Sequence, residues 1–347
     1  MGEAIHQFQQ RNYDSMKGEK LETTSDTLEK IGEIHTDLAL ESRELSIERS
    51  RGQEPPGVDT QTERQGNTLI TRVRVETEEA GRSIGKLPGY YVTLESPSLR
   101  SRDRDQLEEV AFLVAKEIEG FIAKIGVGEN DPCLVVGLGN WNATPDALGP
   151  KVVEHILVTR HLVESSPPEK KGGLRPLAAI APGVLGSTGI ETGEIVMGVV
   201  QRTKPKFVIA VDALASRSTQ RLGATIQLAD TGIHPGSGLG NKRIGITPQT
   251  LGLPVIAIGV PTVVEATTIV HDAMFEINRM APALINPKAF NQQDLIRKVL
   301  SPYMNSLIVT PKEIDVMIDD LARVVSGALN IAIHPGVSPE EVFRYLN

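Results

Sequence analysis

The sequence predicts an α/β protein with a mainly parallel sheet flanked by helices and with additional strands. Short apolar runs rich in Val and Ile alternate with longer segments of helical spacing, which is typical of βαβ units. Hydrophobic residues make up 40% of the 347 residues but aromatic residues only 4%, so aliphatic side chains must build the core. The 32 glycines and 22 prolines supply the many turns that such connections need.

Composition also limits the possible partners. The net charge of −8 argues against general nucleic-acid binding, which needs a basic surface. Cys133, the single cysteine, lies in an apolar run and is expected to be a buried core residue. We find neither a run of about 18 apolar residues nor a secretory signal, so we expect no contact with a membrane.

The first 66 residues are polar and charged and contain few apolar anchors. The stretch from Ser50 to Gly57 is a loop by its Pro and Gly content. Only the stretch from Ile31 to Glu41 interrupts this polar leader. We therefore expect the leader to be flexible or peripherally docked.

Regular structure is expected from residue 67 onward. Residues 68–75 alternate with period two and predict a half-exposed strand, with residues 90–94 as its partner after the Pro88-Gly89 turn. Residues 105–124 have helical spacing, with acidic residues in the first turn.

The rest of the chain alternates between strands and helices. Apolar runs predict strands at 133–138, 177–181, 207–211, 224–228 and 255–259. Helical spacing predicts helices near 146–161, 191–201, 262–282, 311–331 and 338–346, and a Gly-rich loop covers 232–241.

Two aspartates follow strands of this predicted sheet. Asp146 comes after the turn that follows the 133–138 run, and Asp212 ends the 207–211 run. Ligands bind at the carboxyl ends of strands in open α/β sheets, where two carboxylates can share a water and a proton. Two such carboxylates are sufficient for acid–base hydrolysis without a metal. Alone, Asp146 would be a helix cap and Asp212 a structural residue, but their shared position at strand ends favours catalysis.

Other motifs are weaker. The run from Gly137 to Asn140 resembles the start of a dinucleotide fingerprint, but position 142 is Asn rather than the third Gly, so we interpret it as a tight turn. Asp230-Thr-Gly232 is the tripeptide of pepsin-like proteases, but it occurs once, so Asp230 is interpreted as a turn residue. His234 and His271 lack the spacing of a zinc site.

Several longer motifs together resemble the germination protease family of spore-forming bacteria. They are Ile34-His-Thr-Asp-Leu-Ala-Leu-Glu41, Val135-Val-Gly-Leu-Gly-Asn-Trp-Asn-Ala-Thr-Pro-Asp-Ala-Leu-Gly149, Ala210-Val-Asp-Ala-Leu-Ala215, Asp230-Thr-Gly-Ile-His-Pro-Gly-Ser-Gly238 and Pro254-Val-Ile-Ala-Ile-Gly-Val-Pro-Thr262. Members of that family are endopeptidases that degrade small acid-soluble spore proteins.

The resemblance implies an atypical aspartic peptidase with Asp146 and Asp212 as its catalytic pair and with no metal and no other cofactor. It implies a fold similar to that of hydrogenase-maturation peptidases, a homotetramer, and a cytoplasmic location in the forespore and spore core. It also implies a zymogen. We therefore divide the chain into a propeptide at 1–37, a flexible polar segment at 38–66 and a single peptidase domain at 67–347.

The resemblance further implies cleavage after an acid and before an apolar residue and Ala. Thr36-Asp-Leu-Ala39 has that order, which predicts propeptide cleavage between Asp37 and Leu38. Recognition of the acid calls for a cation, for which Arg217, Lys242 and Arg243 are candidates. The remaining substrate-binding candidates are Asn140 and His234.

The sequence is also compatible with two other functional hypotheses. One is a metal-dependent hydrolase on the same α/β fold. The other is a nucleotide-binding module built on the turn Gly137-Leu-Gly139.

Overall fold

The computed structural model describes residues 36–165, 173–234, 244–280 and 307–345. Within these ranges the strands are β1 (Val58–Gln65), β2 (Thr68–Val75), β3 (Gly89–Glu95), β4 (Cys133–Gly137), β5 (Leu177–Ile180), β6 (Phe207–Ser216), β7 (Thr225–Ala229), β8 (Val255–Glu265) and β9 (Ile308–Val309). The longer helices are α3 (Ala39–Arg49), α5 (Arg104–Ile125), α9 (Thr192–Thr203), α11 (Ala266–Met280) and α13 (Ile314–Ile333). The shorter ones are α4 (Glu78–Ile84), α6 (Leu148–Glu154), α7 (Arg160–Ser165), α8 (Leu185–Thr188), α10 (Pro248–Leu251) and α14 (Pro339–Tyr345), with 3-10 turns η1 (Pro97–Arg100), η2 (Thr144–Asp146) and η4 (Thr219–Arg221).

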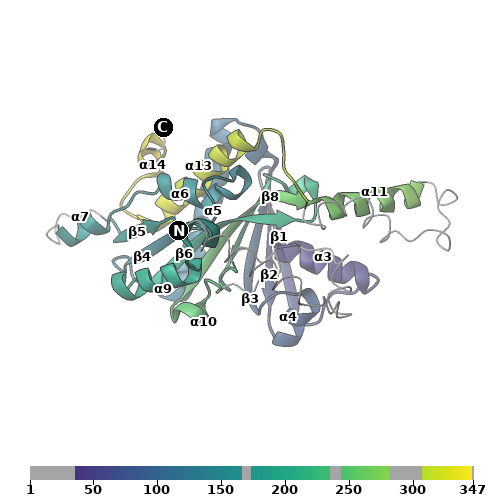
Figure 1. The fold of residues 1–347 in the computed structure, drawn as a ribbon, viewed down its shortest axis with the longest axis horizontal. Helices are drawn as coiled ribbons and strands as arrows, with labels where there is room; N and C mark the ends of the chain where they lie inside the picture. The colour runs from purple at the N-terminus through teal and green to yellow at the C-terminus, as the bar shows by residue number, and fades with distance from the viewer. Residues whose placement is uncertain (1–35, 166–172, 235–243, 281–306, 346–347) are drawn as a thin grey trace, which may run out of the picture.

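The described strands form one nine-stranded sheet in the order β1-β2-β3-β7-β8-β6-β4-β5, with β9 paired to β8 (Figure 1). The strands β8, β6, β4 and β5 run parallel to one another. The additional strands β1, β2, β3, β7 and β9 pair antiparallel. The predicted α/β class is confirmed, and the sheet is mixed because the parallel arrangement is confined to four strands.

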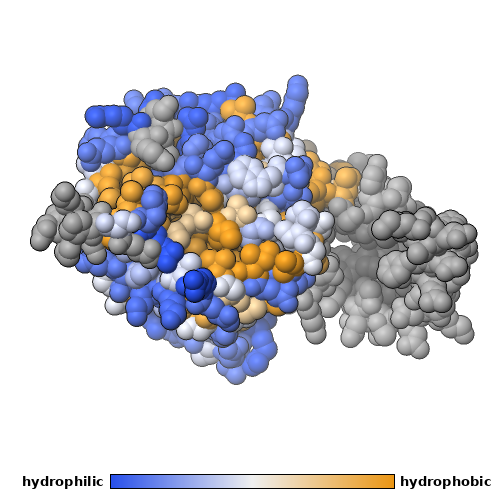
Figure 2. Space-filling model, turned by 60° about the vertical axis from the view of Figure 1, so that its left-hand side comes forward, coloured by the Kyte–Doolittle hydropathy of each residue, from blue (hydrophilic) through white to orange (hydrophobic). Residues whose placement is uncertain are grey.

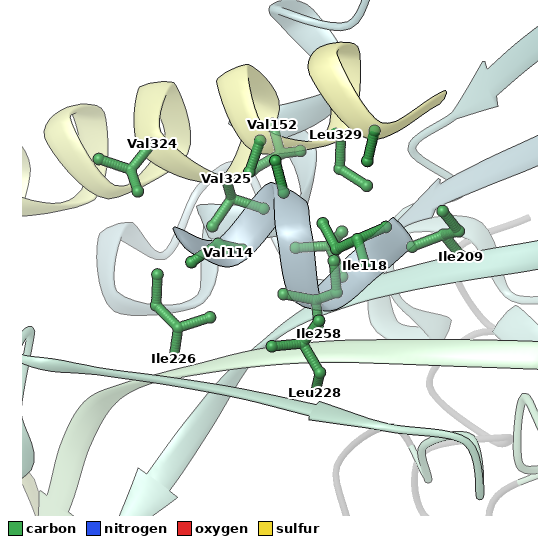
Figure 3. Packing of buried hydrophobic residues seen from close by; sticks show 14 of the residues in the cluster. Val114, Ile118, Val152, Ile209, Ile226, Leu228, Ile258, Val324, Val325 and Leu329 are labelled. Carbon is green, nitrogen blue, oxygen red and sulfur yellow. The ribbon is translucent and has the colours of Figure 1, made fainter. Parts of the chain in front are cut away.

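One face of the sheet carries the main core, which α5, α6 and α13 cover. Figure 3 shows how side chains from these helices meet side chains from the sheet; the labelled ones are Val114, Ile118, Val152, Val324, Val325 and Leu329 from the helices and Ile209, Ile226, Leu228 and Ile258 from the strands. All are aliphatic, as the low aromatic content predicts. Cys133 belongs to the same core, as predicted, and burial raises the pKa of its thiol.

The opposite face is covered in two separate parts. On one part, Val196 and Val200 of α9 pack against β4 and β6. On the other, α3 and α4 contribute Ala39, Ala80 and Ile84 to a cluster over β2, β3 and β7. In Figure 1 both groups of helices lie below the sheet, α9 and α10 to the left and α3 and α4 to the right. Because the two groups are separate, a strip of the sheet between them stays open for a site.

The expectation of a flexible polar segment at 38–66 is wrong for most of its length. Residues Ala39–Arg49 form α3, and Val58–Gln65 form β1, which pairs along its whole length with β2. Leu38 and Ala39 are fully buried. The polar composition suggested a flexible segment for two reasons. Only the first part of α3 is buried, and β1 is an edge strand with an exposed surface.

Most other predicted elements are present, and the differences concern boundaries. The helix predicted near 146–161 is instead the turn η2 followed by the short α6, and α7 begins only at Arg160. The strands predicted at 207–211 and 255–259 extend to Ser216 and Glu265, because β6 and β8 pair with each other along that length. As a result α11 begins at Ala266 rather than near 262. In the described ranges, we find no helix that combines the length and apolarity of a membrane span.

Candidate active site

A cavity of about 970 Å³ opens on the strip of sheet that lies between the two groups of helices on this face, α9 and α10 on one side and α3 and α4 on the other. Its wall includes Asp146 and Asp212, the two predicted catalytic residues. It also includes Asp37, on one side of the predicted cleavage site. A concave site that gathers titratable groups is the usual form of an active site.

Asp212 lies inside β6 rather than beyond its end, and it is buried. In the sheet it is opposite Gly259 of β8, which is opposite Gln227 of β7 on its other side. Residues in one such row point to the same face, so Asp212 and Gln227 stand on either side of a position without a side chain. The Leu214 side chain fills the space over Gly259, because a Cβ there would lie 2.3 Å from Leu214 Cδ1.

Asp146 is delivered by the turn after β4, where its backbone is tightly held. Its carbonyl oxygen accepts a hydrogen bond from the Asn140 N–H at 3.0 Å, and its own N–H donates to the carbonyl of Ala143 at 2.7 Å. Gly139 has a φ of +119°, and a Cβ there would lie 1.9 Å from the Asp146 carbonyl oxygen. Only glycine fits this close approach, so Gly139 fixes the position of Asp146.

The same packing explains the glycines that suggested a nucleotide site. A Cβ on Gly137 would lie 2.1 Å from the carbonyl oxygen of Gly149, and one on Gly149 would lie 2.2 Å from that of Leu138. The space that a phosphate would need in a dinucleotide fold is filled here by the chain's own backbone. The geometry agrees with the interpretation of this motif as a tight turn.

The electrostatic environment of Asp212 favours its protonated form. Burial raises the pKa of Asp212 well above its ordinary value, and the charge of Asp146 raises it further. The N–H of Ala213, which donates to Asp212 Oδ1 at 2.9 Å, works in the opposite direction, and the charge of Asp37 adds to the rise. Asp212 therefore keeps a proton at pH values at which an ordinary aspartate is ionised.

The segment around the predicted cleavage site is seated in this cavity like an added strand. The Asp37 N–H donates to the carbonyl of Ala215 on β6 at 3.0 Å, and the Ala215 N–H donates to Asp37 Oδ2 at 2.8 Å. On the other side, the N–H of Ala39 donates to Gln227 Oε1 at 2.6 Å. The Asp37–Leu38 peptide bond thus lies between Ala215 of β6 and Gln227 of β7.

The carbonyl oxygen of Asp37 has two donors from the protein. Lys86 Nζ donates to it at 2.8 Å and also to the carbonyl of Thr36 at 3.1 Å. Gln227 Nε2 donates to the same Asp37 oxygen at 3.4 Å. Burial holds the pKa of Lys86 below its ordinary value, although the charges of Asp37 and Glu41 oppose this shift.

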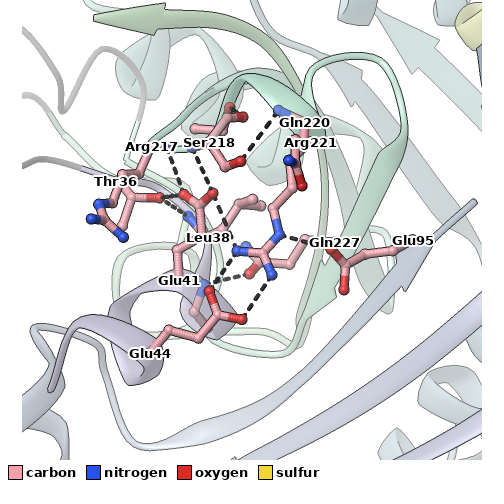
Figure 4. Close-up of polar contacts among 12 residues, drawn as sticks. Thr36, Leu38, Glu41, Glu44, Glu95, Arg217, Ser218, Gln220, Arg221 and Gln227 are labelled. Carbon is pink, nitrogen blue, oxygen red and sulfur yellow. Dashed lines mark hydrogen bonds and ion pairs between the residues drawn. The ribbon is translucent and has the colours of Figure 1, made fainter. Parts of the chain in front are cut away.

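Buried Glu41 anchors the chain just after the cleavage site (Figure 4). Its carboxylate accepts from the backbone N–H groups of Arg217 at 2.7 Å and Ser218 at 3.0 Å, and from the hydroxyl of Thr36. The guanidinium of Arg221 lies 3.3 Å from Glu41 Oε1. It also bonds Glu44 at 2.7 and 2.8 Å and Glu95 at 2.8 Å, so Arg221 ties α3 to β3.

Only some of the remaining predicted site residues line the cavity. Asn140 and His234 line the cavity, and Asn140 Oδ1 also accepts from the N–H of Asn142 at 3.0 Å. Arg217 is absent from the described lining residues; its guanidinium lies 3.6 Å from Glu48 and 3.7 Å from Asp272. Its backbone N–H contributes instead, through Glu41. Lys242 and Arg243 lie outside the described residues.

Asp230 of the Asp-Thr-Gly tripeptide has a structural role, as predicted. Its Oδ1 accepts from the Tyr90 N–H at 2.8 Å, which joins the end of β7 to β3. Burial raises its pKa, opposed by the Tyr90 hydrogen bond and by Lys124.

Sequence reasoning missed Lys86, Gln227 and Glu41. Gln227 had a visible signal, because it is the one amide inside the apolar strand Thr225–Ala229. Lys86 had no such signal, since it follows α4 in a turn whose sequence is typical of a surface connection. Its position depends on Gly81, where a Cβ would lie 2.4 Å from the Lys86 carbonyl oxygen.

One face of the molecule carries both apolar and polar surface. Figure 2 shows apolar surface gathered across the middle of one face, with polar residues above and below it. Large apolar side chains that are exposed include Trp141, Leu162, Leu185 and Ile190. Among the described residues, no group of three or more His, Cys, Asp or Glu side chains is arranged to hold a metal ion.

Comparison with known proteins gives consistent matches. A family model described as germination protease matches residues 36–280 and 285–346. A germination protease from Caldanaerobacter subterraneus subsp. tengcongensis is 48% identical over 326 residues, which cover 90% of this chain and 98% of that protein. One from Bacillus cereus is 42% identical over 356 residues, which cover 90% of this chain and 96% of that protein.

Among solved structures, the [NiFe] hydrogenase maturation protease HycI from Thermococcus kodakarensis is similar to part of the chain. It shares 16% sequence identity with a TM-score of 0.29, and the match covers 60% of this chain and 98% of that one.

Proposed function

This chain belongs to the germination protease family, and we propose that it is an endopeptidase that uses Asp146 and Asp212 as an acid–base pair. The relatives are named as proteases of spore germination, which supports a peptidase acting at that stage. One observation carries the proposal for this chain. Asp37, the residue before the predicted cut, lines the same cavity as the two aspartates.

In the proposed reaction, Asp146 is ionised and accepts a proton from the attacking water. Asp212 is protonated, because burial and the charge of Asp146 raise its pKa. The water oxygen bonds to the carbonyl carbon, the C–N bond breaks, and Asp212 gives its proton to the leaving nitrogen. The two groups share one proton over the cycle and titrate as a pair.

The proposed substrates are small acid-soluble spore proteins, cut after an acidic residue. The chain's own segment supports this specificity, because Asp37 binds along β6 through both its backbone and its carboxylate. Lys242 and Arg243 remain proposed partners for acidic side chains of substrates. The enzyme would act in the cytoplasm of the forespore and in the spore core.

We further propose that residues 1–37 are a propeptide removed by cleavage before Leu38. The position of Thr36 and Asp37 in the cavity wall supports the division of the chain at this bond. Exposed apolar side chains such as Trp141 and Ile190 support self-association, with a homotetramer as the proposed form. Sedimentation equilibrium of the full chain measures that state, and a monomer at micromolar concentration would reject it.

The decisive experiment incubates the protein with a small basic spore protein that contains Thr-Glu-Ile-Ala, with and without EDTA. Mass spectrometry should find cleavage after the Glu in both samples. N-terminal sequencing of the processed enzyme should find Leu38. Cleavage that EDTA abolishes would favour a metal-dependent hydrolase, and a different new N-terminus would reject the proposed propeptide.

A further inference from the structure

We propose that Lys86 is a catalytic residue that binds the carbonyl oxygen of the residue before the cut and stabilises the oxyanion formed there. This proposal rests on the proposed function, because it takes the Asp37–Leu38 bond as a bond that the enzyme cuts. Stabilisation of the oxyanion is thereby assigned to Lys86, whereas the two aspartates transfer protons. The observation that carries it is the 2.8 Å hydrogen bond from Lys86 Nζ to the Asp37 carbonyl oxygen.

Backbone contacts at the end of α4 fix the position of Lys86. Gly85, with φ of +69°, ends α4 in the left-handed conformation, and the Lys86 N–H donates back to the carbonyl of Gly81 at 3.0 Å. These contacts fix the backbone from which the side chain reaches into the cavity. Its ammonium meets two consecutive carbonyls of the docked segment, those of Thr36 and Asp37.

Gln227 holds the same bond from the opposite side. Because the N–H of Ala39 needs an acceptor, the amide oxygen of Gln227 faces Ala39 and its NH₂ group faces the Asp37 carbonyl. The amide therefore contacts the chain before and after the bond to be cut. Gln227 is a positioning residue that holds the peptide in the cavity that Asp212 also lines.

The chemical step balances without a proton from Lys86. As the water oxygen bonds to the carbonyl carbon, the π electron pair moves to the Asp37 oxygen, which becomes an oxyanion beside the ammonium. When the intermediate collapses, that pair re-forms the carbonyl and the C–N bond breaks. The attacking water's proton goes to Asp146, and the leaving nitrogen takes the proton of Asp212. A fixed charge aimed at the developing oxyanion is worth about 10²–10³ in rate.

The test measures the first-order rate at which the full-length chain produces the new N-terminus Leu38. We expect Lys86→Met to lower this rate by about 10²–10³-fold. Lys124→Met is the control, because the Lys124 ammonium also has a specific partner, the ring of Tyr90, and lies away from the cavity. Its rate should stay within about threefold of the wild-type rate, since a change away from the reacting groups alters little. Melting temperatures of all variants show whether each one is folded.

Chemical rescue separates a catalytic role from a structural one. Lys86→Ala removes the propylammonium part of the side chain, and the cavity admits small molecules. Propylammonium should accelerate cleavage by Lys86→Ala, whereas 1-propanol, which fills the same space without charge, should not. Equal rescue by both compounds would mean that Lys86 only fills space, and the proposal would be rejected.

Asp212→Asn distinguishes failure of this inference from failure of the proposed function. If Asp212→Asn stops cleavage while Lys86→Met cuts at the rate of Lys124→Met, only the role of Lys86 is wrong. If a folded Asp212→Asn chain cuts normally, the two-aspartate mechanism is wrong. A wild-type chain that never yields an end at Leu38 would reject the proposed cut and the role of Lys86 with it.

Discussion

Asp212 and Gln227 occupy the same row of the sheet, separated by Gly259. One side chain belongs to a parallel strand and the other to an antiparallel strand, so the row crosses the junction between the two halves of the sheet. The Leu214 side chain packs on the glycine between them, and the docked peptide contacts Gln227 in the cavity that Asp212 also lines. The candidate active site is thus built at the junction of the two sheet halves, on the face that the helices leave open.

Replacing Asp212 by Asn should nearly abolish cleavage, because the amide keeps the shape but has no proton to give to the leaving nitrogen. We expect a loss of about 10²–10⁴-fold in the rate of peptide hydrolysis. Asp230→Asn is the matched control, because Asp230 is also partly buried and Asn can still accept from the Tyr90 N–H. Stopped or quenched assays by mass spectrometry measure both rates. Near-normal hydrolysis by folded Asp212→Asn would end the mechanism.

The raised pKa of Asp212 also predicts a pH dependence of stability. The folded chain keeps the Asp212 proton at pH values at which the unfolded chain has lost it, that is, above about 4. The folded state therefore binds more protons, and this group's contribution to the free energy of unfolding falls as the pH rises through the raised pKa. Asp212→Asn lacks this loss, so its melting temperature relative to wild type should rise between pH 4.5 and 8. Calorimetry in matched buffers checks this, and a difference that does not vary with pH contradicts it.

Gly259→Ala should impair docking of the segment around residue 37. The new methyl group would lie 2.3 Å from Leu214 Cδ1, so the Leu214 side chain must move in the cavity. Overpacking of this kind costs about 1–3 kcal/mol, which urea unfolding measures. The appearance of the Leu38 end should slow as well. Gly198→Ala in α9 is the control, because a Cβ there meets nothing within 4 Å. Equal cleavage rates in the two variants would show that the packing of Leu214 on Gly259 does not matter for cleavage.

Gln227→Met should weaken binding of the residue two places after the cut, because the acceptor for its N–H is lost. An unpaired buried N–H costs about 1–3 kcal/mol, so KM for a Thr-Glu-Ile-Ala peptide should rise on the order of tenfold. A peptide with N-methylalanine lacks that N–H and provides the second arm of a double-mutant cycle. Methylation should harm wild type more than Gln227→Met. Equal losses in both enzymes would indicate that the hydrogen bond is absent during catalysis.

Glu41→Gln should loosen α3, because the buried carboxylate accepts two backbone N–H bonds and pairs with Arg221. The amide NH₂ would face one of these donors. Hydrogen bonds to a charged group contribute about 1.5–3 kcal/mol, and we expect a loss of that order. Glu48→Gln is the control, because Glu48 is largely exposed and lies 3.6 Å from Arg217. Chemical denaturation and limited proteolysis of α3 measure the effect, and equal stability of the two variants would contradict it.

The pattern of the sequence was a good guide wherever an element is half-buried or bounded by strong turn residues. Residues 68–75 form β2 with the predicted bounds, and the predicted helix 105–124 is α5 with one residue added at each end. Period-two and helical spacing are local properties, so the neighbours in the chain are sufficient to reveal them. The helix α3 was missed for the opposite reason: its burial comes from β7 and from contacts with Arg221, which are distant in the sequence.

The sequence by itself determined the α/β class, the two aspartates as candidates, and the acid–apolar–Ala order at residues 37–39. Each is a property of residue type and spacing along the chain. Only the tertiary structure decided that this segment lies in the cavity of the aspartates, that Lys86 and Gln227 contact its carbonyl, and that burial raises the pKa of Asp212. These depend on which strands are neighbours and on how deeply a carboxyl group is buried, and both arise only when distant parts of the chain pack together.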